Sequence, residues 1–266
     1  MANNQLSLNQ TIMQPNWQNY LQQVLKERKD VFVQACISTV ATNELLKDCD
    51  PTSIITASMA AATLNLSTNG NMRQAYLIPY KNKNTGKKEC IFQVGVWGLI
   101  QMAARTGQYT RINATDVRDG EMVEDLLSGE IYLTKAKNRR TLPVIGYVGY
   151  IRLVNGFEKS VFMSIEEINE HKKKYNKGGS LWVDEFEKMA KKTVLKQVLK
   201  YGPLSDDMKQ ALKYDQSVLR PNFENGEVDA HYVDGKPSRV QTDSDIMNES
   251  LGIVIEANET ENVEDK

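Results

Sequence analysis

The sequence has little histidine and little cysteine, with two histidines and three cysteines among 266 residues. Cys36, Cys49 and Cys90 are odd in number and far apart, which predicts free thiols in a reducing compartment rather than disulfides or a metal site. His171 stands beside three lysines on a face that the pattern predicts to be solvated. We therefore do not expect it to act as a general base, because such a base usually needs an orienting partner.

Long hydrophobic runs are also missing. No stretch of 18 apolar residues occurs, so no segment is predicted to span a membrane. Residues 1–10 are polar and uncharged, which differs from the pattern of a signal or transit peptide. These features predict a cytoplasmic protein without a membrane partner.

Motifs for nucleotide or acid–base chemistry are incomplete. Residues 85–88 resemble the end of a phosphate-binding loop, but the first glycine and the final Ser/Thr of that motif are replaced by Lys81 and Lys88. The paired acids 166–167 and 206–207 stand at predicted helix starts, where carboxylates complement the helix dipole. We therefore predict no catalytic residue, no enzymatic activity, no ATP site and no cofactor, with Mg²⁺ at most an accessory.

Charge is present in quantity but is unevenly divided. Residues 221–266 hold twelve acidic and three basic residues, whereas residues 1–220 hold 22 acidic and 30 basic residues. A basic body of net charge +8 thus carries an acidic segment of net charge −9, although the whole chain nets only −1. This asymmetry indicates a polyanionic partner.

Hydrophobic periodicity predicts alternating groups of helices and strands. Helical patterns cover about 17–40, 51–66, 96–105, 165–176, 182–201 and 204–214, and strand patterns cover 74–80, 90–94, 109–117, 130–136, 144–154 and 157–163. We expect a flexible N-terminus at 1–16, a core at 17–220, an acidic linker at 221–249, and a C-terminal tail or small partner-binding module at 250–266. The sequence leaves the two alternatives for 250–266 open.

Local signals mark several element boundaries. Asp50 followed by Pro51 is typical of a helix start. Asn155-Gly156 predicts a hairpin turn between strands 144–154 and 157–163. Ser164 followed by Glu167 predicts a capping box, and residues 177–180 predict the end of that helix. Pro79 favours an edge strand or the end of a strand.

A stripe of lysines runs along the helix predicted at 182–201. Lys188, Lys192, Lys196 and Lys200 recur every four residues, with Lys191 beside them. This spacing places the side chains on one helical face, where like charges repel one another. Leu195 and Leu199 fall within the same arc, so the face is not predicted to be simply solvated. We interpret the stripe as an anion-binding surface, although an ordinary charged surface is the alternative.

Two further regions combine positive charge with aromatic or amide groups, as single-stranded nucleic acid requires. The hairpin region contains Arg73, Tyr76, Tyr80, Lys81, Lys83, Lys87, Lys88, Phe92 and Gln93, and the following region contains Trp97, Gln101, Arg105, Tyr109, Arg111 and Arg118. Each has a plainer alternative, because the hairpin lysines could form a solvated turn and Trp97 could belong to the core.

These residues carry a family resemblance. The motif Trp182-x-x-Glu-Phe-x-x-Met-Ala-x-Lys-Thr-x-Leu195, with Pro203 beyond it, resembles the signature of the RecT family of phage single-strand annealing recombinases. Glu185 stands where that family often has Asp. Residues 60–66, 75–80, 92–100 and 105–114 resemble its N-terminal core, so that the match covers about 30–205 in order and leaves out 221–266.

The resemblance implies an α+β fold, with a small antiparallel sheet and hairpins packed against several helices, that oligomerises into rings or helical filaments. It implies single-stranded DNA binding and ATP-independent annealing in bacteriophage or prophage recombination, in the cytoplasm of a bacterial host. Expected partners are single-stranded DNA, annealed duplex DNA, further copies of the chain, an exonuclease and a host single-strand-binding protein. A coat protein that does not anneal, or a metal-dependent nuclease, would be the alternatives.

The residues that we predict to contact DNA come from all three basic regions. We expect the lysine stripe and the hairpin at 73–93 to line one groove, Thr193 to donate a hydrogen bond to a phosphate, and Trp97 to stack on a base or buttress the groove. The predicted set is Arg73, Tyr76, Lys81, Lys83, Lys87, Lys88, Gln93, Trp97, Arg105, Tyr109, Arg111, Lys188, Lys191, Lys192, Thr193, Lys196 and Lys200.

Overall fold

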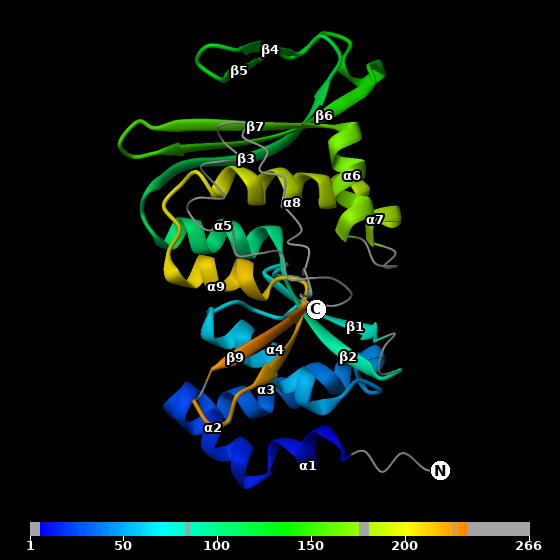
Figure 1. Ribbon diagram of the computed structural model, residues 1–266, viewed down its shortest axis with the longest axis vertical. Coiled ribbons are helices and arrows are strands. Elements are labelled where there is room, and N and C mark those ends of the chain that lie inside the picture. Colours follow the sequence, from blue (N-terminus) through cyan, green and yellow to red (C-terminus); the bar gives the residue numbers. More distant parts are fainter. Residues whose placement is uncertain (1–5, 83–85, 176–180, 226, 233–266) are drawn as a thin grey trace, which may run out of the picture. The chain divides into compact units, whose positions relative to one another are not determined.

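The protein is described from a computed structural model, which covers residues 6–82, 86–175, 181–225 and 227–232 (Figure 1). These residues all belong to one unit, Met1–Val233. Helices and antiparallel strands are mixed along it, which confirms the α+β fold.

The N-terminal quarter is helical. Its elements are α1 (Leu8–Ile12), α2 (Pro15–Leu25), α3 (Lys29–Thr42) and α4 (Pro51–Thr63), with 3-10 turns at Lys26–Arg28 and Glu44–Leu46. The pattern at 17–40 had suggested one helix, but Lys26 adopts a positive φ of 50° and separates α2 from α3. The chain before α2 also differs from the expected flexible N-terminus. Ser7 and Gln10 form a capping box on α1, and Ile12 is buried in the core. Residues 1–5 lie outside the described residues.

Two larger sheets and one hairpin form the β structure. The first sheet has the order β1 (Ala75–Lys81), β2 (Lys88–Val94), β8 (Ser217–Pro221) and β9 (Val228–Tyr232). The second has the order β3 (Tyr109–Arg118), β6 (Val144–Leu153) and β7 (Glu158–Ser164), and β4 (Met122–Asp125) pairs with β5 (Glu130–Leu133). All pairs are antiparallel, and β1 is an edge strand, as Pro79 predicted.

The remaining helices follow the strands. They are α5 (Val96–Arg105), α6 (Ile165–Tyr175), α7 (Leu181–Asp184), α8 (Phe186–Leu199) and α9 (Asp206–Tyr214), with a 3-10 turn at Arg139–Thr141. The capping box at the start of α6 is confirmed: Glu167 N donates to Ser164 Oγ at 3.2 Å, and Ser164 N donates to Glu167 Oε2 at 2.7 Å. The helix end predicted at 177–180 falls outside the described residues.

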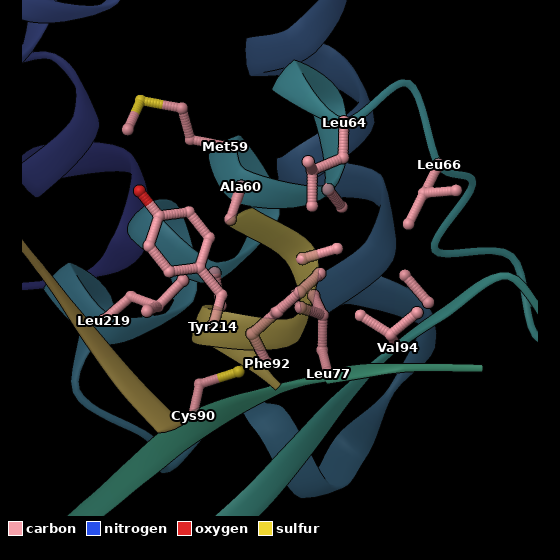
Figure 2. Close-up of a cluster of buried hydrophobic side chains, with 14 of the residues drawn as sticks. Met59, Ala60, Leu64, Leu66, Leu77, Cys90, Phe92, Val94, Tyr214 and Leu219 are labelled. Atoms are coloured by element: carbon pink, nitrogen blue, oxygen red, sulfur yellow. The ribbon is translucent and has the colours of Figure 1, made fainter. Parts of the chain in front are cut away.

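Helix α4 is the centre of the main core. Asp50 caps its first turn by accepting from Ser53 N, and ten of its thirteen residues are buried. Small residues such as Ala60 allow it to approach β2 and β8, against which it packs. Figure 2 shows Met59, Ala60 and Leu64 gathered with Phe92 and Leu219 from those strands.

The segment after Arg220 differs from the predicted acidic linker over the part that the structure describes. Leu219 pairs with Ala230 in the β8–β9 hairpin, which completes the first sheet. The ring of Phe223 lies 5.1 Å from that of Trp17, centroid to centroid, and so fixes the connection onto α2. The folded part therefore extends to at least Tyr232, and residues 233–266 lie outside the described residues.

Candidate nucleic-acid interface

Helix α8 carries the lysine stripe and packs directly on the second sheet (Figure 1). The approach is close because Gly149 of β6 has no side chain. A Cβ atom at Gly149 would lie only 2.5 Å from the carbonyl oxygen of Val194. Val194 and Val198 are fully buried on this side of the helix. The sheet therefore fixes the position of α8 and of the lysines that project from it.

The lysines at the start of α8 are paired with glutamates. Lys188 is exposed and its Nζ lies 2.6 Å from Glu185 Oε1, while Lys191 is half-buried and pairs with Glu187. Exposed pairs at this spacing are worth only a few tenths of a kcal/mol and open easily. Both ammonium groups are thus close to solvent, but each is partly neutralised within its own helix.

The middle of the stripe does not face solvent. Lys192 is only 4% exposed, and its Nζ lies 3.2 Å from Asp215 Oδ1. Lys196 is half-buried and its Nζ lies 2.7 Å from Asp215 Oδ2. Asp215 also accepts from the backbone N–H of Val94 at 2.9 Å. The structure therefore gives Lys192 an internal partner, where the sequence predicted a contact with a bound anion.

Asp215 is ionised because of these lysines. Burial acts to raise its pKa, but the ammonium groups of Lys192 and Lys196 outweigh burial and lower the pKa to about 2. Burial also lowers the pKa of Lys192, and the Asp215 carboxylate opposes that change. One carboxylate faces two ammonium groups, so this trio retains a net charge of about +1 when all three groups are ionised.

Thr193, the expected phosphate donor, is buried as well. Its hydroxyl donates to the carbonyl oxygen of Met189 at 2.9 Å, one turn earlier in α8. The hydroxyl proton is therefore used within the helix. A contact between Thr193 and phosphate would require that bond to be exchanged.

Positive groups from α6 and α8 converge on one another near His171. We call His171, Lys174, Lys196 and Lys200 the cationic site. Burial lowers the pKa of His171 to about 4, and the positive charges of Lys196, Lys174 and Lys200 lower it in the same direction. The two helices pack together, because Ile168 of α6 and Ala190 and Val194 of α8 belong to one buried cluster.

Aromatic rings lie beside the same two helices. The Nζ of Lys159 on β7 lies 5.2 Å from the ring centroid of Tyr201, which directly follows Lys200 and is exposed. The Nζ of Lys172 on α6 lies 5.6 Å from the ring centroid of Phe186. His171 lies against Trp182, with ring centroids 6.1 Å apart. Trp182 is buried and Phe186 is partly buried, so Tyr201 is the exposed ring among these. An exposed aromatic face next to a cation is the combination that binds the bases and phosphates of single strands.

The hairpin β1–β2 meets α8 at one end only. Val94, at the end of β2, bonds to Asp215 and so lies beside Lys192 and Lys196. Lys88, at the start of β2, is six residues away, or about 20 Å along a strand. The structure therefore brings the Val94 end of the hairpin to the lysine stripe but leaves its turn at a distance.

The predicted hairpin residues divide accordingly. Tyr76 and Gln93 are Cα partners next to the Val94 end, and the carbonyl of Arg73 lies against Gly95. Lys81, Lys87 and Lys88 lie at the turn, where the Nζ of Lys88 is 2.7 Å from Asp48 Oδ2. Lys83 lies outside the described residues.

Two predicted residues of the second region have contacts of other kinds. Arg105 donates to the carbonyl oxygens of Leu64 and Asn65 at 2.8 and 2.5 Å, and so holds the end of α4. The Tyr109 hydroxyl donates to the carbonyl oxygen of Pro203 at 3.0 Å.

Trp97 and Arg111, from the same region, are both exposed. Trp97 lines an open pocket on α5. Arg111 is the Cα partner of Arg152 on β3 and β6. The structure does not bring Trp97 and Arg111 into contact with the cationic site.

Sequence reasoning missed Asp215, His171, Lys174 and Tyr201. Asp215 has no local signal, because its partners lie about 20 and 120 residues earlier in the chain. The run of three lysines after His171 was visible, but the fold was needed to show that it meets α8. Glu121 was missed for the same reason: it is buried and pairs with Arg139 at 3.0 Å, at the base of the β4–β5 hairpin.

Within 6–82, 86–175, 181–225 and 227–232, no group of three or more His, Cys, Asp or Glu side chains is arranged to hold a metal ion. In the same ranges, no helix has the length and hydropathy needed to cross a membrane.

The chain was compared with known protein families and curated proteins. The model of the RecT family matches residues 30–230. The chain is 36% identical over 220 residues to the uncharacterized protein YqaK of Bacillus subtilis, covering 82% of this chain and 75% of that protein. It is 31% identical over 188 residues to protein RecT of Escherichia coli, covering 66% of this chain and 69% of that protein. The family match includes both α8 and the cationic site, and the chain belongs to the RecT family.

Proposed function

We propose that this protein binds single-stranded DNA and anneals complementary strands without ATP, in homologous recombination of the phage type. The observation that carries the proposal is the packing of α6 against α8, which places Lys174, Lys196 and Lys200 on two adjoining helices. A site that keeps several positive charges together is favourable when a polyanion neutralises them. Membership of the RecT family makes DNA the expected polyanion.

Annealing follows from how such a site would hold a strand. Lysines grip phosphates and carry no information about base sequence, so the Watson–Crick edges remain available for pairing. Neutralised phosphates repel an incoming complementary strand less. The exposed Tyr201 ring beside Lys200 offers a face on which a base could stack.

No covalent bond is made or broken in this process. We therefore propose a binding role for these residues and assign none of them to catalysis, with no ATP and with Mg²⁺ at most an accessory. Further copies of the chain, a partner exonuclease and a host single-strand-binding protein are proposed partners in the cytoplasm of a bacterial host. We propose residues 250–266 as a segment that contacts such partners.

The binding test replaces Lys174 and Lys200 with glutamine and measures single-stranded DNA affinity against salt concentration. Each lost phosphate contact should reduce the slope of log affinity against log salt by about 0.7. Lys47→Gln and Lys209→Gln are matched controls, because both lysines are exposed and lie outside the cationic site. An unchanged affinity and slope in the double variant would exclude the cationic site as the binding surface.

A coat protein that binds strands without pairing them is the alternative. The two functions differ in one measurement: the rate at which complementary fluorescent oligonucleotides pair in the presence of protein. Pairing no faster than the spontaneous rate, with intact DNA binding, would favour the coat protein. Loss of intact substrate in Mg²⁺ or Mn²⁺ would instead indicate a nuclease.

A further inference from the structure

The β4–β5 hairpin exposes apolar side chains that have no use within the described fold. Leu126 and Leu127 at its tip are 88% and 97% exposed. Val123 and Tyr132, which are direct cross-strand partners and therefore share a face, are also exposed. Large exposed apolar groups gathered on one hairpin usually mark an interaction surface.

The hairpin tip is held in a defined shape. The Asp125 carboxylate accepts from Leu127 N and from the Ser128 hydroxyl, both at 2.9 Å, and Gly129 N donates to the Asp125 carbonyl at 2.7 Å. At the base, the buried Glu121 accepts from Ala136 N at 3.1 Å and pairs with Arg139. A tip that is ordered in advance loses less conformational entropy on docking.

The hairpin is also acidic, although the body of the chain is basic. Residues 119–134 contain five acidic residues and no basic residue. Of these, Glu124 and Glu130 are exposed on β4 and β5. The surface that receives the hairpin should therefore combine an apolar floor with positive charge.

One pocket in the described part of the chain has this combination. Met72, Trp97, Ile100 and Ala104 provide its apolar lining, and Arg105 lies at its edge. Trp97 is 54% exposed despite its size. The exposed Arg73, between two lining residues, has no acidic partner among the residues that the structure describes.

We infer that the β4–β5 hairpin of one copy docks into the Trp97 pocket of a second copy of the same chain. The hairpin and the pocket are different surfaces, so the contact is head-to-tail and generates a ring or an open helical filament. The inference deepens the proposed function by naming the contact between copies. The contact itself does not involve the cationic site and can form without DNA.

Disulfide trapping tests this contact directly. Leu127→Cys and Ala104→Cys are made in separate proteins, mixed without DNA and oxidised. The native cysteines should not compete, because all three are buried and burial raises the pKa of Cys36 and Cys49 to about 11. We expect covalent dimers that contain one chain of each variant. A protein carrying both substitutions should form longer covalent chains.

Val31→Cys is the matched control, because Val31 is exposed like Ala104 but lies on α3. Mixed with Leu127→Cys, it should give at least about tenfold less product, since its thiol would not be held near the partner's thiol. Equal trapping by Val31→Cys would overturn the inference. So would products joined only through two copies of residue 127, which would indicate a symmetric contact.

A second measurement does not depend on thiols. Leu126→Asp together with Leu127→Asp leaves the core untouched and should weaken self-association in sedimentation velocity by at least about tenfold. Trp97→Ala should weaken it as well. Association that is unchanged in both variants, or a wild-type protein that stays monomeric, would overturn the inference. Intact DNA binding by the monomeric double variant would leave the proposed function standing.

Discussion

At the scale of the residue, the central group is Asp215. It joins β2 to α8 by accepting one backbone bond and holding two ammonium groups, one of them fully buried. The lysine stripe is therefore partly structural, and only its Lys196–Lys200 end belongs to the cationic site. A variant that replaces Lys192 would test stability rather than DNA contact.

The first prediction concerns Asp215→Asn. Without the carboxylate, Lys192 becomes a buried charge with no partner, and the free energy of unfolding should fall by about 3–5 kcal/mol. Urea denaturation measures this change. Adding Lys192→Met should recover part of the loss, because the unpaired charge is removed. A loss below about 1 kcal/mol in Asp215→Asn would contradict the role of the trio.

The second prediction concerns pH. The folded pKa of His171 is about 4, whereas an unfolded histidine titrates near 6.5. Between about pH 6.5 and pH 4, His171 therefore binds a proton in the unfolded chain but not in the folded protein. The free energy of unfolding falls as the pH drops through this range. His171→Gln should flatten this part of the stability curve. His231→Gln, at an exposed position on β9, is the matched control.

At the scale of the element, local sequence signals predicted the helix starts and the hairpin turn correctly. The pairing of strands that are distant in the sequence could not be predicted in this way. Asp50-Pro51 and Ser164 with Glu167 each set a boundary that the structure confirms. Asn155-Gly156 also connects the two strands that it predicted, with Gly156 at a φ of 89°. These signals act within a few residues, so they can be read without knowing the fold.

The missed elements depend on distant partners. β4 and β9 are short, carry acidic residues and pair at a sheet edge or in a lone hairpin. The alternation of apolar and polar residues in β4 and β9 covers only a few positions. The acidic residues of these two strands resemble the composition of a linker. The cationic site was missed in the same way, because α6 and α8 are brought together by a buried cluster that includes Ile168, Trp182 and Ala190.

The third prediction tests how the second sheet positions α8. Gly149→Val would place side-chain atoms against the Val194 carbonyl and should destabilise the fold by about 1–3 kcal/mol as α8 moves away from β6. Gly156→Ala is strained only at its own turn and serves as a comparison, because it lacks neighbours within 4 Å. Thermal unfolding measures both. DNA affinity should fall with Gly149→Val alone, and equal affinity in both variants would contradict this account.

At the scale of the whole molecule, charge is separated along the chain. The family match ends at residue 230, close to the end of β9 at Tyr232. Beyond it, residues 234–266 hold nine acidic and three basic residues. An acidic segment attached to a cationic body competes with DNA for the same charges.

The fourth prediction follows from this separation. Deleting 234–266 should preserve the fold and tighten single-stranded DNA binding at low salt, with the gain fading as salt rises. Deleting 221–266 instead removes β9 and should destabilise the first sheet. Fluorescence anisotropy and thermal unfolding distinguish the two. Weaker binding by the shorter deletion would show that the acidic segment supports DNA binding rather than opposing it.

The central claim is that the cationic site holds one strand while a complement pairs with it. The most direct measurement is the rate of annealing of complementary oligonucleotides, followed by fluorescence quenching without ATP. Wild-type protein should accelerate pairing, and Lys174→Gln with Lys200→Gln should lose most of that acceleration while unfolding at the wild-type temperature. Full acceleration by this folded double variant, or none by the wild type, would contradict the account.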